Sequence, residues 1–215
     1  MTIGRAARVM VSSGMLLLVG IDAAAQTPPQ PPPTRAWTFG GSAYTYFLPD
    51  EPNYLQPAVT VDRGWLHLEA RFNYEARDTG SVWGGVNFSG GDAVSWELTP
   101  MLGGVFGDTS GVAPGYRGSI AWRALEFFSE GEAMFDADDS VDSFFYNWSE
   151  LALAPRDWLR FGLVTQRTRA YQADRVVQRG LLVGTSIRRL DVTAYLFNPD
   201  DSKPIFVLAF AARWD

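Results

Sequence analysis

Acidic and basic side chains recur at every second position in several segments of this 215-residue chain. A histidine, two glutamates and an arginine alternate with apolar residues between positions 67 and 75, and three glutamates do so between 126 and 132. Residues at alternate positions of a β-strand point to the same side of the sheet. The spacing therefore predicts carboxylates and guanidiniums gathered on one face, where they pair with each other or line an aqueous path.

The segment from Trp65 to Glu75 shows this alternation best. Leu68, Phe72 and Tyr74 fall on its apolar face, opposite the charged set. About a dozen such segments lie between residues 37 and 214, joined by connections that are alternately short and long. A closed transmembrane barrel has short turns at one rim, longer loops at the other and strands of ~9–11 residues. We therefore predict an all-β, closed antiparallel up-and-down transmembrane β-barrel of twelve strands, with ten as the alternative.

Two local irregularities are expected within these strands. In the segment from 143 to 154, Phe144, Tyr146 and Glu150 share one face, which indicates a β-bulge there. Pro57 and Pro100 each lack a ladder donor and indicate further bulges or strand ends.

The strand alternation assigns a set of polar residues to the interior of the barrel. One interpretation of this set is a narrow acidic path that favours cations, and the other is a closed interior in which Arg and Glu pair across strands. The set consists of His67, Glu69, Arg71, Asn73, Glu75, Glu97, Arg117, Glu126, Glu130, Glu132 and Arg160, with Glu150 as a weaker member.

Catalysis has less support than either interpretation. A membrane-embedded lipid hydrolase would need a Ser–His pair facing lipid, and the one histidine, His67, is assigned to the interior. Glu130 and Glu132 form a carboxylate pair of the type that hydrolyses glycans, but no cleft is apparent from the sequence. We therefore assign no catalytic residue, no cofactor and no enzymatic activity.

Tryptophan positions provide a separate indication of a membrane. Indole rings prefer the membrane interface, where the ring is apolar and the N–H finds a partner. Six of the eight tryptophans lie close to a short turn or to an end of the predicted barrel, and we assign these to an interface girdle: Trp37, Trp65, Trp96, Trp122, Trp158 and Trp214.

The N-terminal region has the three parts of an export signal. Arg5 and Arg8 precede a short apolar stretch, and Ala23–Ala25 provides a small-residue cleavage site. We assign residues 1–25 to a signal peptide, 26–36 to a proline-rich periplasmic spacer and 37–215 to the barrel.

The predicted long loops carry two further candidate sites. Asp136, Asp138 and Asp142 alternate as calcium ligands do, but the segment lacks the Gly and Glu of an EF-hand, so solvated loop residues are the alternative. A cluster of arginines has the geometry to bind lipopolysaccharide phosphates or to pair with acidic loops. This cluster consists of Arg167, Arg169 and Arg175.

Bulk composition restricts the remaining classes of function. The net charge of −6 and the sequence pI of about 4.8 argue against a nucleic-acid partner. The absence of cysteine leaves ladder hydrogen bonds and burial as the sources of stability.

Together these features resemble the Gram-negative outer-membrane β-barrel class. The last segment alternates from Phe206 to Trp214 and looks like the C-terminal strand that the barrel-assembly machinery recognises, although Asp215 follows the aromatic residue. The resemblance implies a monomer in the outer membrane, in contact with lipid and lipopolysaccharide. We expect a small porin-like channel with an acid-rich lumen, and the alternatives are a non-conducting structural or surface-interaction barrel and a lipid hydrolase.

Overall fold

The computed structural model describes residues 36–137, 143–170 and 176–215, and these form β-strands and their connections. No helix long and apolar enough to cross a membrane occurs among the described residues. The strands are β1 (Thr38–Phe47), β2 (Tyr54–Arg63), β3 (Leu66–Phe72), β4 (Thr79–Val86), β5 (Phe88–Gly90), β6 (Ser95–Gly107), β7 (Gly111–Trp122), β8 (Leu125–Asp136), β9 (Phe144–Arg156), β10 (Leu159–Ala170), β11 (Val176–Ile187), β12 (Leu190–Phe197) and β13 (Ile205–Trp214).

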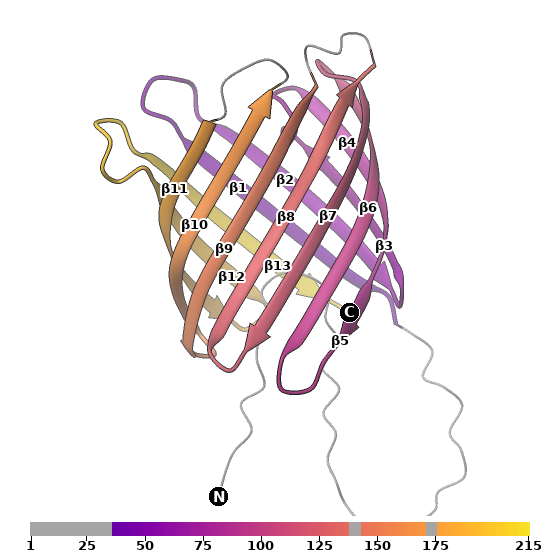
Figure 1. The fold of residues 1–215 in the computed structure, drawn as a ribbon, viewed down its shortest axis with the longest axis vertical. Coiled ribbons are helices and arrows are strands. Elements are labelled where there is room, and N and C mark those ends of the chain that lie inside the picture. The colour runs from indigo at the N-terminus through magenta and orange to yellow at the C-terminus, as the bar shows by residue number, and fades with distance from the viewer. Residues whose placement is uncertain (1–35, 138–142, 171–175) are drawn as a thin grey trace, which may run out of the picture.

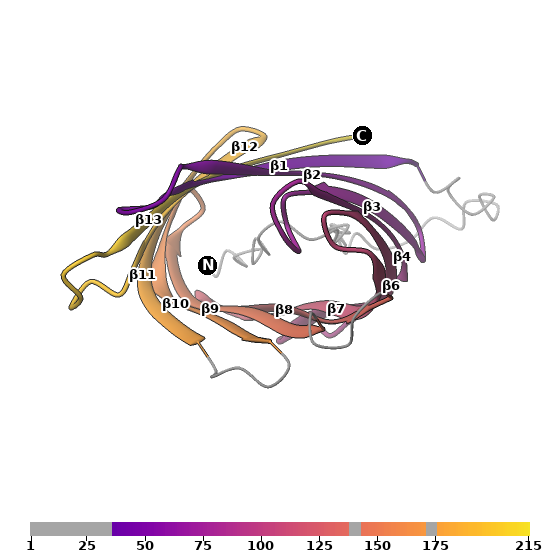
Figure 2. The same cartoon turned by 90° about the horizontal axis from the view of Figure 1, so that it is seen from above.

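The strands close into a single antiparallel barrel (Figures 1 and 2). Apart from β4 and β5, each strand pairs with the next one along the chain, and β1 pairs with β13, so that Phe39 lies opposite Trp214. β4 and β5 pair with the same strand, β6, and together act as one strand of the ring. The barrel therefore has twelve strands, which confirms the predicted count over the alternative of ten.

A proline accounts for the division between β4 and β5. Gly85 pairs with Met101 and Phe88 pairs with Leu98, so the register continues across the break and places Val86 opposite Pro100. Proline has no N–H to donate, and the ladder is interrupted at that point. The irregularity expected at Pro100 thus occurs in the partner strand, while β6 itself continues.

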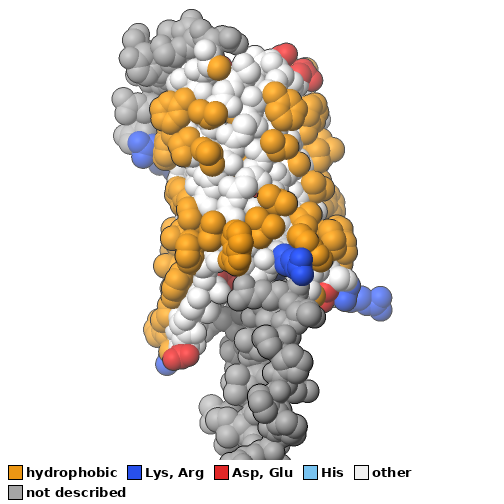
Figure 3. All heavy atoms as spheres, turned by 90° about the vertical axis from the view of Figure 1, so that its right-hand side faces the viewer, with side chains coloured by type: hydrophobic (Ala, Val, Ile, Leu, Met, Phe, Trp, Pro, Cys, Tyr) orange, Lys and Arg blue, Asp and Glu red, His pale blue; other side chains and the backbone are white. Residues whose placement is uncertain are grey.

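Alternation along the strands separates the two faces of the barrel wall. On β3, Leu68 and Phe72 are exposed on the outside, while His67, Glu69 and Arg71 are 2%, 5% and 7% exposed. The same division holds on β8 and β6, and it follows the faces that the sequence predicts. The outer surface is consequently apolar over most of its height, and charged side chains lie toward its ends (Figure 3).

Three local predictions were wrong. Pro57 marks neither a bulge nor a strand end, because β2 runs through it in an unbroken register with β1. Tyr74 was assigned to the apolar outer face, but Asn73 adopts a φ of 58° and ends the alternation of β3, which turns Tyr74 inward. No bulge occurs between Phe144 and Glu150, because Phe144, Tyr146, Trp148 and Glu150 share the inner face in an unbroken register. The register shift of this hairpin lies instead near Pro155, between Leu159 and Phe161.

Short and long connections alternate around the barrel, as predicted. Two-residue turns join β2 to β3, β7 to β8, β9 to β10 and β11 to β12, and all of them lie at the rim that carries both ends of the ring. Each of the six tryptophans assigned to the girdle is at least 41% exposed and lies near one of these turns, near the β5–β6 connection or near a ring end. Residues 1–35 lie outside the described residues, so the signal peptide and the spacer remain predictions.

Candidate functional site in the barrel interior

The inner wall carries a connected group of charged side chains that begins near the short-turn rim. His67 on β3 lies between two carboxylates, with Nδ1 2.8 Å from Asp62 Oδ1 and Nε2 3.2 Å from Glu69 Oε2. Arg71 donates from Nε to Glu69 Oε1 at 2.9 Å and from Nη1 to Glu132 Oε2 at 3.0 Å. The chain of contacts thus crosses from β3 to β8, two strands that are not neighbours in the ring.

Arg117 on β7 extends this group toward the middle of the barrel. Its Nη2 donates to Glu69 Oε1 at 3.1 Å and to Glu130 Oε2 at 3.2 Å. The hydroxyl of Tyr74 donates to the other oxygen of Glu130. We call this connected group the β3–β8 network. Its members are His67, Glu69, Arg71, Tyr74, Arg117, Glu130 and Glu132.

Aromatic rings complete the surroundings of the central guanidinium. The Cζ atom of Arg71 lies 4.4 Å from the ring centroid of Tyr74 and 4.4 Å from that of Trp83. A buried charge must be both paired and hydrogen-bonded, because its desolvation costs several kcal/mol. Carboxylates and aromatic faces meet this requirement for Arg71.

A second ion-pair cluster lies on the opposite part of the wall. Arg160 on β10 donates to Glu150 Oε2 at 2.7 Å, and its Nε lies 3.6 Å from Glu126 Oε2. Glu150 also accepts hydrogen bonds from Trp148 Nε1 at 2.9 Å and from the Tyr195 hydroxyl at 2.8 Å. Four strands, β8, β9, β10 and β12, therefore converge on one carboxylate–guanidinium pair.

Aromatic side chains fill the barrel beside this cluster. Trp148 makes edge-to-face contacts with Tyr44, Tyr195 and Phe197, with ring centroids 6.0, 5.1 and 5.3 Å apart. Trp148, Tyr195 and Phe197 are at most 3% exposed. This half of the interior is therefore a packed core, and open space lies between it and the β3–β8 network.

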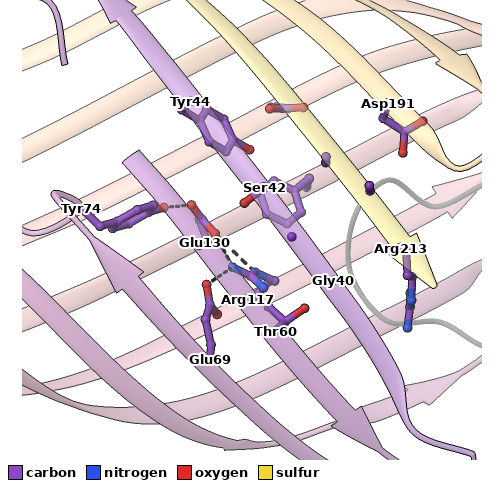
Figure 4. A pocket seen from close by; sticks show the side chains of 16 residues that line it. Gly40, Ser42, Tyr44, Thr60, Glu69, Tyr74, Arg117, Glu130, Asp191 and Arg213 are labelled. Carbon is purple, nitrogen blue, oxygen red and sulfur yellow. Dashed lines mark hydrogen bonds and ion pairs between the residues drawn. The ribbon is translucent and has the colours of Figure 1, made fainter. Parts of the chain in front are cut away.

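Two cavities occupy that space. The inner cavity, of about 170 Å³, is lined by Tyr44, Phe128, Glu130 and Glu150 among others. Asp191 and Arg213 line it on the side away from Tyr74 and Glu69 (Figure 4). The outer cavity, of about 440 Å³, lies toward the long-loop rim and is lined by residues that include Tyr54. Tyr74 is the lining residue that the two cavities have in common.

The candidate residues from the sequence take different places in this arrangement. Glu69, Arg117 and Glu130 line the inner cavity, while Asn73 and Glu75 line the outer one. The remaining candidates are placed in the wall, outside both cavities, where Arg71 and Glu132 pair with each other and Arg160 lies close to Glu126. This group consists of His67, Arg71, Glu97, Glu126, Glu132 and Arg160.

The predicted interior set omits Tyr74, which the alternation assigns to the outer face, and three charged residues that face inward: Asp62, Asp191 and Arg213. The signal for Tyr74 was Asn73, one of the few residue types that adopt a positive φ readily and so end a strict alternation. Asp62 was detectable from the alternation of its strand, in which it shares a face with Gln56 and Ala58.

The outer-rim candidates are only partly described. Arg167 lies on β10 with its Cζ 5.8 Å from the ring centroid of Phe145, whereas Arg175, Asp138 and Asp142 lie outside the described residues, as does the side chain of Arg169. Asp136 ends β8, and its backbone N–H bonds to Ser143 Oγ. Among the described residues, no group of three or more His, Asp or Glu side chains is placed to hold a metal ion.

A closed twelve-stranded antiparallel barrel with an apolar outside and a charged inside is the architecture of the outer-membrane β-barrel class. Solved structures share the fold, among them two porins. A KdgM porin superimposes with a TM-score of 0.58 at 6% identity, over 82% of this chain and 99% of that one. A KdgM porin in complex with disordered oligogalacturonate gives 0.56 at 8% identity, over 83% and 99%. No protein-family model matches the chain, and no curated protein does.

Proposed function

We propose that this chain is an outer-membrane channel with a narrow polar path that favours small cations. The apolar exterior and the exposed tryptophans at one rim favour a bilayer as its surroundings. The fold shared with two porins favours the same class.

The arrangement of the two cavities about Tyr74 carries the proposal. The interior is neither open along its axis nor filled throughout, since it holds two separate cavities of about 440 and 170 Å³ that share Tyr74 as a lining residue. Tyr74 belongs to the connection after β3 rather than to a strand, and its hydroxyl is held by Glu130. Such a side chain acts as the constriction of a path between the cavities.

The charge of the inner cavity supports the preference for cations. Its lining includes the carboxylates of Glu69, Glu130, Glu150 and Asp191, against the guanidiniums of Arg117 and Arg213. Rings of carboxylates favour cations in channels. Oligogalacturonate, the ligand named with one of the two porins, is a polyanion, and this lining does not suit it.

Single-channel recording of the refolded chain in planar bilayers tests the proposal. Replacing Tyr74→Ala should raise the conductance, because it removes the side chain between the cavities. Tyr54→Ala is the matched control, because Tyr54 lines only the outer cavity and its loss should leave the conductance close to that of the wild type. Absence of conductance steps in both the wild type and Tyr74→Ala would refute the channel.

A non-conducting structural barrel is the second candidate function. The ion pairs of the β3–β8 network favour it, because they cross the interior in the way that a polar core does. The hydrolase has less support, because the described hydrogen bonds of the His67 ring go to carboxylates and none goes to a serine. We further propose a monomer that contacts outer-membrane lipid and lipopolysaccharide and that presents β13 to the barrel-assembly machinery.

A further inference from the structure

The short-turn rim carries exposed arginines, and two of them rest on girdle tryptophans. The Cζ atom of Arg63 lies 5.0 Å from the ring centroid of Trp37, and that of Arg123 lies 4.9 Å from the ring centroid of Trp122. The remaining members of this basic rim are Arg156, Arg188 and Arg189, which lie in or beside the β9–β10 and β11–β12 turns and are also exposed.

Tight turns hold two of these arginines at the end of the barrel wall. Arg123 and Arg188 are the first residues of two-residue turns and adopt φ values of 56° and 59°. Each of these turns lies directly after the last outward-facing residues of its strand, so the guanidiniums begin where the apolar exterior ends. That depth corresponds to the headgroup layer of the membrane in the proposed orientation.

The two rims differ in charge. The described exposed charges near the short turns are five arginines against Asp92, Asp157 and Asp215. At the long-loop rim the carboxylates of Asp50, Glu51, Asp78, Asp108, Asp200 and Asp201 outnumber Arg77, Arg179 and Lys203. Among the described exposed side chains, basic residues therefore outnumber acidic ones at the rim that carries the girdle and not at the long-loop rim.

We propose that the short-turn rim binds the phosphates of anionic phospholipids, with Arg63 and Arg123 as the principal contacts. This inference rests on the membrane location within the proposed function and names the lipid that the rim prefers. Guanidinium is the side-chain group best suited to bidentate contacts with phosphate, and a ring beneath it limits the conformations that binding must order. Basic residues near an anionic membrane surface contribute about 1 kcal/mol each, which corresponds to about a fivefold change in affinity.

Quenching by brominated lipids measures this preference directly. The full chain is refolded into phosphatidylcholine vesicles that contain either brominated phosphatidylglycerol or brominated phosphatidylcholine, and quenching of tryptophan fluorescence is compared. Trp37 and Trp122 lie beneath the arginines and report on the rim, whereas Trp83 and Trp148 are inside the barrel and 3% exposed. We expect brominated phosphatidylglycerol to quench more strongly, and added salt to reduce the difference.

Paired variants identify the residues responsible. Arg63→Gln with Arg123→Gln should lower the preference for phosphatidylglycerol about fivefold for each arginine removed. Arg63→Lys with Arg123→Lys should keep part of it, because lysine retains the charge and loses the planar contact with the ring. The matched control is Arg77→Gln, because Arg77 also stacks on an aromatic ring, Tyr54 at 5.0 Å, but lies at the long-loop rim. It should retain the full preference.

Three outcomes would overturn the proposal. Equal quenching by the two brominated lipids in the wild type would show that the rim meets something other than anionic lipid, for example an acidic protein. An equal loss in Arg77→Gln and in the double glutamine variant would assign the preference to overall charge. Failure to insert into either kind of vesicle would remove the membrane location itself. A barrel that shows the lipid preference without conductance would refute only the channel.

Discussion

Arg71 offers the most direct test of the interior described above. It is 7% exposed, donates hydrogen bonds to Glu69 and Glu132, and lies between the rings of Tyr74 and Trp83. Among the described residues Arg71 supplies the hydrogen bond to Glu132 Oε2, and Glu132 Oε1 has none. Arg71→Met keeps much of the volume and leaves Glu132 as an unpaired buried carboxylate.

The expected cost is large. Removing one partner of a buried ion pair costs about 3–5 kcal/mol, and we expect about 3 kcal/mol here because the inner cavity gives water access to the neighbouring Tyr74. Arg77→Met is the matched control: its side chain is 43% exposed and is paired with Glu51, so its loss should cost less than about 1 kcal/mol.

Equilibrium urea unfolding in vesicles, followed by tryptophan fluorescence, measures both values. Adding Glu132→Gln to Arg71→Met should recover part of the loss, because a neutral amide replaces the unpaired charge. If Arg71→Met and Arg77→Met proved equally stable, the network would be solvated and the assignment of a buried ion pair would be wrong.

Two further predictions concern charge. Glu130→Gln should reduce the cation preference, measured as a smaller reversal potential in a salt gradient, because Glu130 lines the inner cavity. Glu51→Gln at the outer rim should change the reversal potential less. An unaltered reversal potential in Glu130→Gln would contradict the cation path. A hydrogen bond from Arg179, whose Nη2 lies 2.6 Å from Asp200 Oδ2, holds the pKa of the exposed Asp200 below its usual range. The small stabilisation from this pair should therefore be present above about pH 4 and be lost as the pH falls through the lowered pKa. Thermal melts of Asp200→Asn and the wild type over a pH series should converge at the acid end, and a constant difference would show that the pair contributes nothing through its charge.

The architecture was predictable because two periodic signals agree. The alternation of residue types along segments such as the one around Glu69 requires one polar and one apolar face. The alternation of short and long connections sets the number of strands once the ring is closed. These features depend on neighbours along the chain, and the sequence displays them directly.

The interior was predictable as a set of residues but not as an arrangement. Arg71 and its partner Glu132 are 61 positions apart in the sequence. Their contact depends on the tilt and stagger of the strands around the barrel, which no local sequence pattern encodes. Tyr74 was misplaced for a related reason. A single left-handed residue, Asn73, reverses the face of the residue after it, and strict parity counting does not anticipate such a residue.

The pairing of β1 with β13 has a consequence for how the barrel forms. When β4 and β5 are counted as one strand, every other pairing joins neighbours along the chain, whereas this seam joins residues as distant as Phe39 and Trp214. Hairpins can therefore form early, but each intermediate sheet keeps two unsatisfied edges and exposes its charged face until the ends meet. We expect the ion pairs within hairpins, such as Arg117–Glu130, to form early, and those that cross the interior, such as Arg71–Glu132, to form together with ring closure, so that loss of β13 would leave no stable smaller barrel.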